Sequence, residues 1–205
     1  HLYAPNQLYA QAMVYEPLVR YGAGGEIEPC LATGWQIEDE GRSYVFRLRR
    51  EVRFSDGTPF DAAAVKLNVD AVLANRPRHA WLELITQIEG LDVLAADSVR
   101  LRLRAPYYPT LLELSLIRPL RFISPAAIPA SGTGTTIQAP IGTGPWKLHD
   151  TARDERDTFV RNDTYWGQRP GVERLVVRVM PDPTTRALAL QSGEIDLLYG
   201  SDIVA

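Results

Sequence analysis

The sequence predicts a mixed α/β fold in which strands outnumber helices. Residues 34–60 contain three short runs in which apolar and polar side chains alternate, a pattern typical of half-buried strands. Residues 62–75 instead repeat apolar side chains at helical spacing and follow Asp61, a preferred helix N-cap. Fifteen glycines and fifteen prolines divide the rest of the chain into short elements. Strands and helices alternating in this way indicate a mixed α and β class.

The elements expected before residue 60 are a helix, a short strand and a meander. Residues 5–15 place apolar side chains at helical spacing, with Asn6 as the N-cap. Residues 18–21 form a short strand that ends in a glycine-rich turn. The three alternating runs then predict a three-stranded meander, whose third strand is 52–54.

The elements expected after residue 75 are shorter and more numerous. They are a short helix within 76–85, a hairpin of 88–94 and 99–103, a helix to about residue 116, a long surface loop over 125–140, strands at 146–149, 158–161 and 175–180, a helix over 184–192 that Gly193 ends, and a strand over 195–198.

Composition excludes several classes of protein. The chain has 205 residues, 45% hydrophobic and 23% charged, which excludes a disordered chain and allows one large or two small domains. The net charge of −3 argues against a nucleic-acid binder, which carries a basic excess. No apolar run approaches the ~20 residues that span a bilayer.

The two ends of the sequence suggest a fragment. The chain begins at His1 without a methionine or a signal-like segment, and it stops at Ala205 without a closing element. We therefore expect it to be part of a longer protein.

The residue types that carry most chemistry are scarce or badly spaced. Cys30 is the only cysteine, which excludes an internal disulfide and a multi-cysteine metal site. His1, His79 and His149 do not stand at the close spacing of a sequence-local metal site. No G-x-S-x-G motif is present, and Gly142-x-Gly144 precedes a strand rather than a phosphate-binding helix. We expect a protein that is not an enzyme.

Arginines beside aromatic residues are the more informative pattern. Arg76 and Arg78 stand just before Trp81, and Arg118 precedes Pro119 at the end of an expected helix. A guanidinium held at such a position binds a carboxylate through two parallel hydrogen bonds, and a tryptophan beside it supplies an apolar wall.

Several motifs, taken in order, resemble the family 5 solute-binding proteins of ABC importers, which take up peptides and nickel. They are Tyr15-Glu16-Pro17-Leu18-Val19, Pro29-x-Leu31-Ala32-x-x-Trp35, Tyr44-x-Phe46-x-Leu48-Arg49, Val52-x-Phe54-Ser55-Asp56-Gly57-Thr58-Pro59-Phe60, Gly142-Thr143-Gly144-Pro145-Trp146 and Asn162-x-x-Tyr165-Trp166-Gly167. The segments Arg78-His79-Ala80-Trp81-Leu82-Glu83-Leu84 and Arg118-Pro119-x-Arg121-Phe122-Ile123 further resemble the nickel-binding branch of this family.

The resemblance implies a fold and a domain division. Family members have two lobes of the type II periplasmic-binding-protein kind, and this chain corresponds to most of the first. Residues 1–38 and 140–205 would form a cleft-side domain with a mixed β-sheet flanked by helices, and 39–139 would form an inserted β-rich subdomain. The signal peptide and the second lobe, with the family's direct histidine ligand to the metal, would lie outside this chain.

The resemblance also implies a ligand and a site. The nickel-binding branch captures nickel as a complex with a small carboxylate chelator such as histidine, in the periplasm, and delivers it as a monomer to ABC permease subunits. By analogy, Arg118 pairs with chelator carboxylates and Arg78 adds positive potential. Tyr3 and Trp81 form aromatic walls, and no residue of this chain contacts the metal directly.

One position departs from the nickel-binding pattern. The branch has a methionine where this chain has Leu8, which keeps an apolar wall but lacks the soft sulfur. A dipeptide or oligopeptide receptor of the same family is therefore the alternative, and haem or another metal chelate remains open as the ligand.

Overall fold

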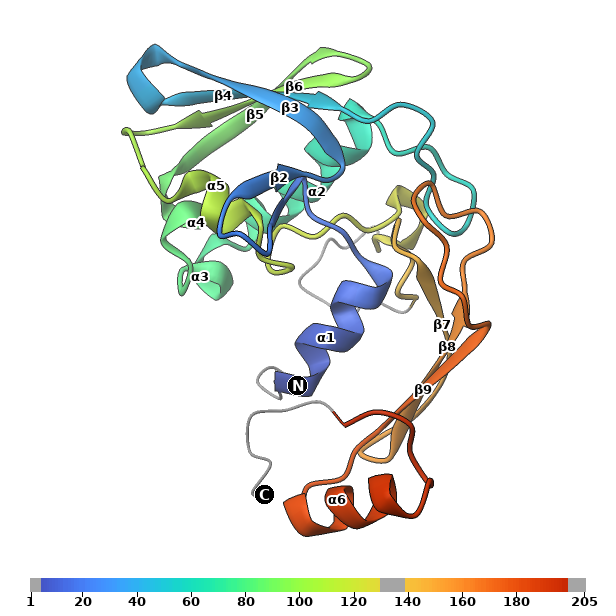
Figure 1. Ribbon diagram of the computed structural model, residues 1–205. Coiled ribbons are helices and arrows are strands. Elements are labelled where there is room, and N and C mark those ends of the chain that lie inside the picture. The colour runs from blue at the N-terminus through green and yellow to red at the C-terminus, as the bar shows by residue number, and fades with distance from the viewer. Residues whose placement is uncertain (1–4, 130–138, 199–205) are drawn as a thin grey trace.

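The computed structural model describes residues 5–129 and 139–198, which form two larger sheets and a two-stranded hairpin (Figure 1). The larger of the two sheets is a four-stranded antiparallel sheet with the order β3–β4–β6–β5. Its strands are β3 (Ala32–Glu38), β4 (Ser43–Leu48), β5 (Ile88–Ala95) and β6 (Ser98–Leu103). The smaller sheet has the order β7–β8–β9, formed by β7 (Trp146–Ala152), β8 (Arg156–Arg161) and β9 (Arg174–Arg178).

Helices cover one face of the four-stranded sheet. They are α2 (Ala62–Ala74), α3 (Arg76–His79), α4 (Glu83–Gln87) and α5 (Thr110–Leu114), and short 3₁₀ turns occupy Asp39–Gly41 and Pro125–Ala127. Asp61 caps α2 by accepting a hydrogen bond from the Ala64 amide at 2.9 Å, as the sequence predicts. The apolar stripe of α2 packs into a core with Phe46, Phe54 and Phe122, all essentially unexposed.

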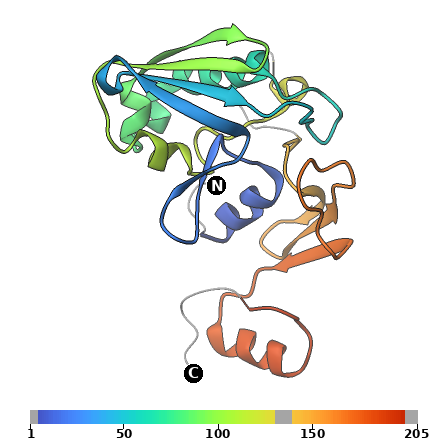
Figure 2. The ribbon, with the colours of Figure 1, turned by 45° about the horizontal axis from the view of Figure 1, so that its top comes forward.

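A second core joins the first helix to the three-stranded sheet. The helix α1 (Pro5–Val14) lies against β7, and Val14 and Tyr15 pack with Trp146 and Phe159. The hairpin of β1 (Val19–Tyr21) and β2 (Ile27–Pro29) then leads into β3. Figure 2 shows α6 (Pro183–Gln191) beyond the end of the three-stranded sheet, apart from both cores. No helix within the described ranges is long and apolar enough to cross a membrane.

Several expectations about the elements are wrong in detail. Residues 52–54 are not the third strand of a meander, because the chain turns back over 55–59 and Arg53 makes only a single bridge to Pro59. The free edge of β4 pairs with β6 instead. The helix α1 begins at Pro5, so Asn6 lies inside its first turn rather than at the cap.

The expected strand over 195–198 is also absent from the described part of the chain. The amides of Glu194 and Ile195 both donate to the Ala189 carbonyl and so complete the end of α6, where Gly193 has a φ of +75°. Backbone amides used in this way are not available to a sheet.

The mixed sheet that the family resemblance implies is not seen among the described strands, which pair only antiparallel. Neighbouring strands such as β5 and β6 are joined by hairpins, and hairpins bring strands together in opposite directions. The strand β3 belongs to the same sheet as β4, although the expected division assigned residues 32–38 to the cleft-side domain. The division itself stays a prediction.

Candidate functional site

Three of the five predicted site residues have described side chains. Arg78, Trp81 and Arg118 come from two segments on the side of the molecule that carries α3 and α5. Tyr3 lies outside the described residues. Leu8 lies within α1, but its side chain is outside the described part of the structure.

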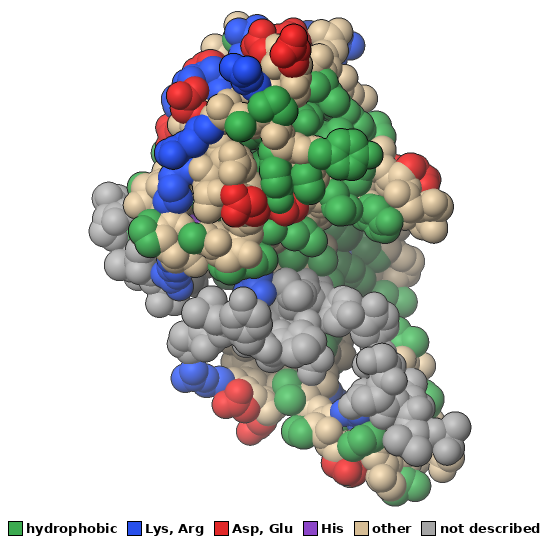
Figure 3. Space-filling view, turned by 90° about the vertical axis from the view of Figure 1, so that its left-hand side faces the viewer, with side chains coloured by type: hydrophobic (Ala, Val, Ile, Leu, Met, Phe, Trp, Pro, Cys, Tyr) green, Lys and Arg blue, Asp and Glu red, His purple; other side chains and the backbone are tan. Residues whose placement is uncertain are grey.

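Arg78 and Trp81 are presented outward by the segment that holds α3 and α4. Leu82, Leu84 and Ile85 are buried in the core beneath this segment. Arg76 stabilises this segment, because its guanidinium donates hydrogen bonds to the carbonyls of Ile85 and Ile88. Arg76 is therefore a structural residue, whereas Trp81 remains 53% exposed. Figure 3 shows this side of the molecule, where hydrophobic side chains gather with lysines and arginines at their edge.

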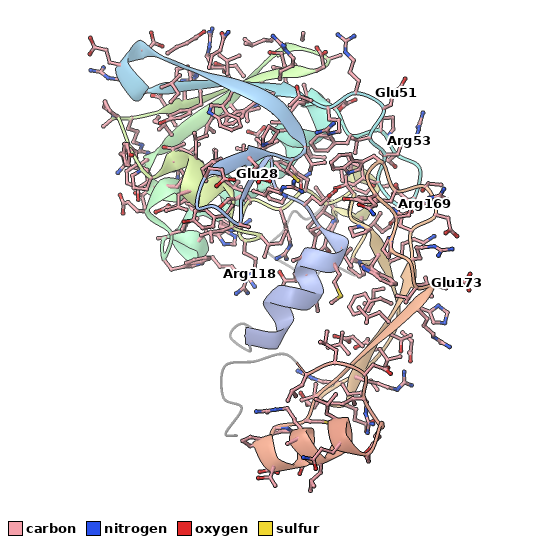
Figure 4. All side chains as sticks on the ribbon, in the orientation of Figure 1. Glu28, Glu51, Arg53, Arg118, Arg169 and Glu173 are labelled. Carbon is pink, nitrogen blue, oxygen red and sulfur yellow. The ribbon has the colours of Figure 1, made fainter. Side chains whose placement is uncertain are left out.

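Arg118 begins the loop that connects α5 to the core. The peptide bond between Arg118 and Pro119 is cis, and the side chain of Arg118 is half-buried. In Figure 4 it lies between α1 and the helices that cover the four-stranded sheet. The loop is fixed by Asn68, whose amide donates to the Ile123 carbonyl at 2.9 Å and accepts from the Ile123 amide at 3.0 Å.

Arg121 is a further charged residue of this region that the sequence analysis did not single out as a site residue. Its Nη1 donates to Oε1 of Gln11 on α1 at 2.6 Å. Its guanidinium carbon lies 5.2 Å from the centre of the Tyr15 ring, a cation–π geometry. The sequence carried no signal for this role, although Leu120 and Phe122 on either side of Arg121 are both buried in the structure.

The positive charges of these residues act on one another. Burial lowers the pKa of Arg121, and the charges of Arg118 and Arg78 lower it further. Burial also lowers the pKa of His79, as do the charges of Arg78 and Arg121. We call Arg78, Arg118 and Arg121 the arginine cluster.

The arginine cluster is suited to anions. None of the ion pairs among the described residues includes Arg78 or Arg121. Guanidinium groups beside an exposed indole match a ligand with carboxylates and a flat face. Within residues 5–129 and 139–198, no three His, Cys, Asp or Glu side chains come together as a metal site. The guanidinium groups of this region can bind carboxylates through paired hydrogen bonds.

Glu16, the residue after Tyr15, is a buried carboxylate with three hydrogen-bond donors. Glu16 accepts hydrogen bonds from Thr143 Oγ1 at 2.8 Å, Tyr165 OH at 2.7 Å and Trp166 Nε1 at 2.8 Å. Burial raises the pKa of Glu16 despite these three hydrogen bonds, which act to lower it. Glu16 directly follows Tyr15, so this network fixes the ring on which Arg121 lies.

Comparison with known proteins identifies the family. The model for bacterial extracellular solute-binding proteins, family 5, matches residues 26–203. The chain belongs to this family. Membership confirms the expectation of a binding protein rather than an enzyme.

Individual relatives of this family 5 protein are similar over nearly the whole chain. It is 50% identical to the nickel-binding periplasmic protein of Escherichia coli over 98% of its length, which is 38% of that relative. NikA from Brucella suis, crystallised in complex with Fe(III)-EDTA, is 57% identical with a TM-score of 0.92, covering 98% of this chain and 40% of that one. NikZ from Campylobacter jejuni, in complex with Ni(L-His), is 26% identical with a TM-score of 0.82, covering 90% and 37%. The chain thus spans about 40% of the length of these relatives.

Proposed function

We propose that this chain is most of the first lobe of a periplasmic binding protein that captures nickel as a complex with a small carboxylate chelator, such as histidine. The observation that carries the proposal is the arginine cluster beside Trp81. Two relatives support the identity of the ligand, since one is named as nickel-binding and another was crystallised with Ni(L-His). ABC permease subunits are the proposed recipients.

The proposed roles rest on the family resemblance and, for Arg78, Trp81 and Arg118, on their positions in the structure. Arg118 binds a chelator carboxylate through paired hydrogen bonds, and Arg78 adds positive potential from the neighbouring segment. Trp81 forms an apolar wall, together with Tyr3 and Leu8 from the N-terminal segment. The proposed domains are 1–38 with 140–205, and 39–139, in a lobe of the type II periplasmic-binding-protein kind.

Calorimetry tests this proposal on the full-length protein that contains this chain. Nickel with excess L-histidine should bind, and Arg118→Ala should weaken binding by about 2–5 kcal/mol, because the ligand's carboxylate loses a charged partner. Arg20→Ala is the matched control, since Arg20 is exposed and pairs with Glu28 at 2.8 Å on the β1–β2 hairpin. Absence of binding, or equal affinities for wild type and Arg118→Ala, would refute the proposal.

The alternative is a dipeptide or oligopeptide receptor. Such a receptor needs a carboxylate to bind the positively charged amino terminus of the peptide. The charges that act on Arg121 and His79 are instead positive, because they come from neighbouring guanidinium groups, which lower both pKa values. Competition between a dipeptide pool and the nickel–histidine complex separates the two ligands. Displacement of the complex by peptides would favour the receptor.

A further inference from the structure

Arg121 is half-buried, as Arg118 is, and its guanidinium contacts two residues of the N-terminal segment. Its guanidinium lies against the Tyr15 ring and donates to Gln11, while its Nε is buried without a hydrogen-bond partner among the described residues. The Gln11 amide and the face of the Tyr15 ring satisfy part of the hydrogen-bonding capacity of the Arg121 guanidinium, but neither carries a full negative charge. Burying a cation in this way is costly unless an anion compensates it.

The surroundings of Arg121 increase that cost. The charged groups that act on it are the neighbouring guanidiniums of Arg118 and Arg78, and no ion pair of the described residues includes it. Tyr15, the remaining titratable neighbour, has a pKa raised by burial, so it is neutral in the physiological range. The compensating negative charge must then come from outside this part of the chain.

A rigid scaffold holds Arg121 in place. Tyr15, the residue after α1, lies close to Gly142, where an added Cβ would overlap the Val14 carbonyl oxygen and come within 2.8 Å of the Tyr15 ring. The Gly144 amide also donates to the Val14 carbonyl at 2.9 Å. Because Arg121 follows Arg118 by three residues in the same loop, fixing Arg121 also fixes the start of that loop.

We propose that Arg121 is a positioning residue that anchors the Arg118 loop to α1 and adds a half-buried positive charge, so that the site prefers metal complexes with a net negative charge over neutral ones. The proposal rests on the proposed function. It concerns the charge of the complex and not the identity of the metal. The bound anion supplies the charge that Gln11 and Tyr15 do not.

The test compares two nickel complexes on the full-length protein. The EDTA complex of nickel is a dianion, whereas the bis(L-histidinate) complex is neutral, and the metal is the same in both. Arg121→Gln should weaken binding of the EDTA complex at least about tenfold and that of the histidinate complex by less than about threefold. Arg121→Lys keeps the charge and should restore most of the preference.

Each outcome has a distinct meaning. If the wild type binds neither complex, the proposed function fails. If the wild type binds and Arg121→Gln weakens both complexes equally, or Arg121→Lys restores nothing, Arg121 only packs the loop and this inference is wrong. Should Arg121→Gln not fold, Gln11→Met removes only the hydrogen bond to the guanidinium, and it should reduce the preference for the dianion without changing Tm. An unchanged preference in that variant would equally overturn the inference.

Discussion

The indole nitrogen of Trp166 donates a 2.8 Å hydrogen bond to the carboxylate of Glu16, a residue 150 positions earlier in the chain. The guanidinium of Arg49 lies on the other side of the same tryptophan, 4.4 Å from the ring centre. Three segments that the sequence analysis treated as separate family motifs therefore meet around one buried carboxylate. Since Glu16 adjoins Tyr15, this meeting point determines where α1 ends and where Arg121 lies.

Removing the acceptor should destabilise the protein strongly. In Glu16→Leu, the hydroxyls of Thr143 and Tyr165 and the indole of Trp166 lose their acceptor while remaining buried, and we expect a loss of about 3–5 kcal/mol. Glu16→Gln should lose only about 1–2 kcal/mol, because its amide oxygen still accepts two of these bonds. Urea unfolding of the full-length protein measures both losses, and Glu155→Gln is an exposed control. Equal losses for the two substitutions would contradict this account.

The same carboxylate should impose a pH dependence on stability. Burial raises the pKa of Glu16 above its ordinary value of 4.5, so the folded protein binds a proton more readily than the unfolded chain. The contribution of Glu16 to stability therefore increases as pH falls through the raised pKa toward 4.5 and decreases as pH rises through that window. The unfolding free energy of the wild type relative to that of Glu16→Gln should therefore increase as pH falls through this window. A difference that does not vary with pH would contradict a raised pKa for Glu16.

The end of α1 should not tolerate a side chain at residue 142. In Gly142→Ala, the new Cβ meets the Val14 carbonyl and the Tyr15 ring, so either α1 or the loop must move, at a cost of about 2–4 kcal/mol. Gly171→Ala is the matched control, since nothing lies within 4 Å of its Cβ position. Thermal unfolding of the two variants compares them directly. A Gly142→Ala protein as stable as Gly171→Ala would show that the contact is loose.

Local patterns in the sequence predict local structure well. The cap of Asp61 on α2, the hairpin of β5 and β6 and the glycine that ends α6 all depend on neighbouring residues, and all are present. The third strand of the meander is absent, because the free edge of β4 pairs with β6, some fifty residues later, rather than with residues 52–54. Alternation cannot distinguish the two, since Val52 and Phe54 are buried without being in a strand.

The candidate site shows the same limit. Arg78, Trp81 and Arg118 are recognisable because each stands in a segment that resembles a binding family. Arg121 stands in one of those segments, yet nothing in its own neighbours says that it is buried. Its partners, Gln11 and Tyr15, are more than a hundred positions away and reach it only when α1 packs against the loop.

Trp81 should matter for binding and not for folding. It is 53% exposed, so Trp81→Ala should change stability by less than about 0.5 kcal/mol. The same variant should weaken binding of the nickel–histidine complex by about 1–2 kcal/mol, the loss expected for an aromatic wall. Tyr108→Ala removes an aromatic ring that is more exposed than Trp81, and it should leave both quantities unchanged. A stable Trp81→Ala protein with full affinity would remove Trp81 from the site.

His79 should report the charge of the bound complex. Burial and the charges of Arg78 and Arg121 lower its pKa below 6.5, so stability falls as pH drops through 6.5 to that lower value. An anionic complex offsets the two positive charges and should raise the pKa of His79, so that binding at a pH of about 6 takes up protons.

Calorimetry of nickel–EDTA binding in two buffers of different ionisation enthalpy measures this proton uptake, because the EDTA carboxylates of the complex do not titrate near that pH. The uptake should be present in the wild type and in His149→Gln, an exposed histidine of β7, and should be lost in His79→Gln. Uptake that persists in His79→Gln would mean that another group near the arginine cluster titrates on binding. Its loss would show that the bound anion lies close enough to Arg78 and Arg121 to neutralise their effect on His79.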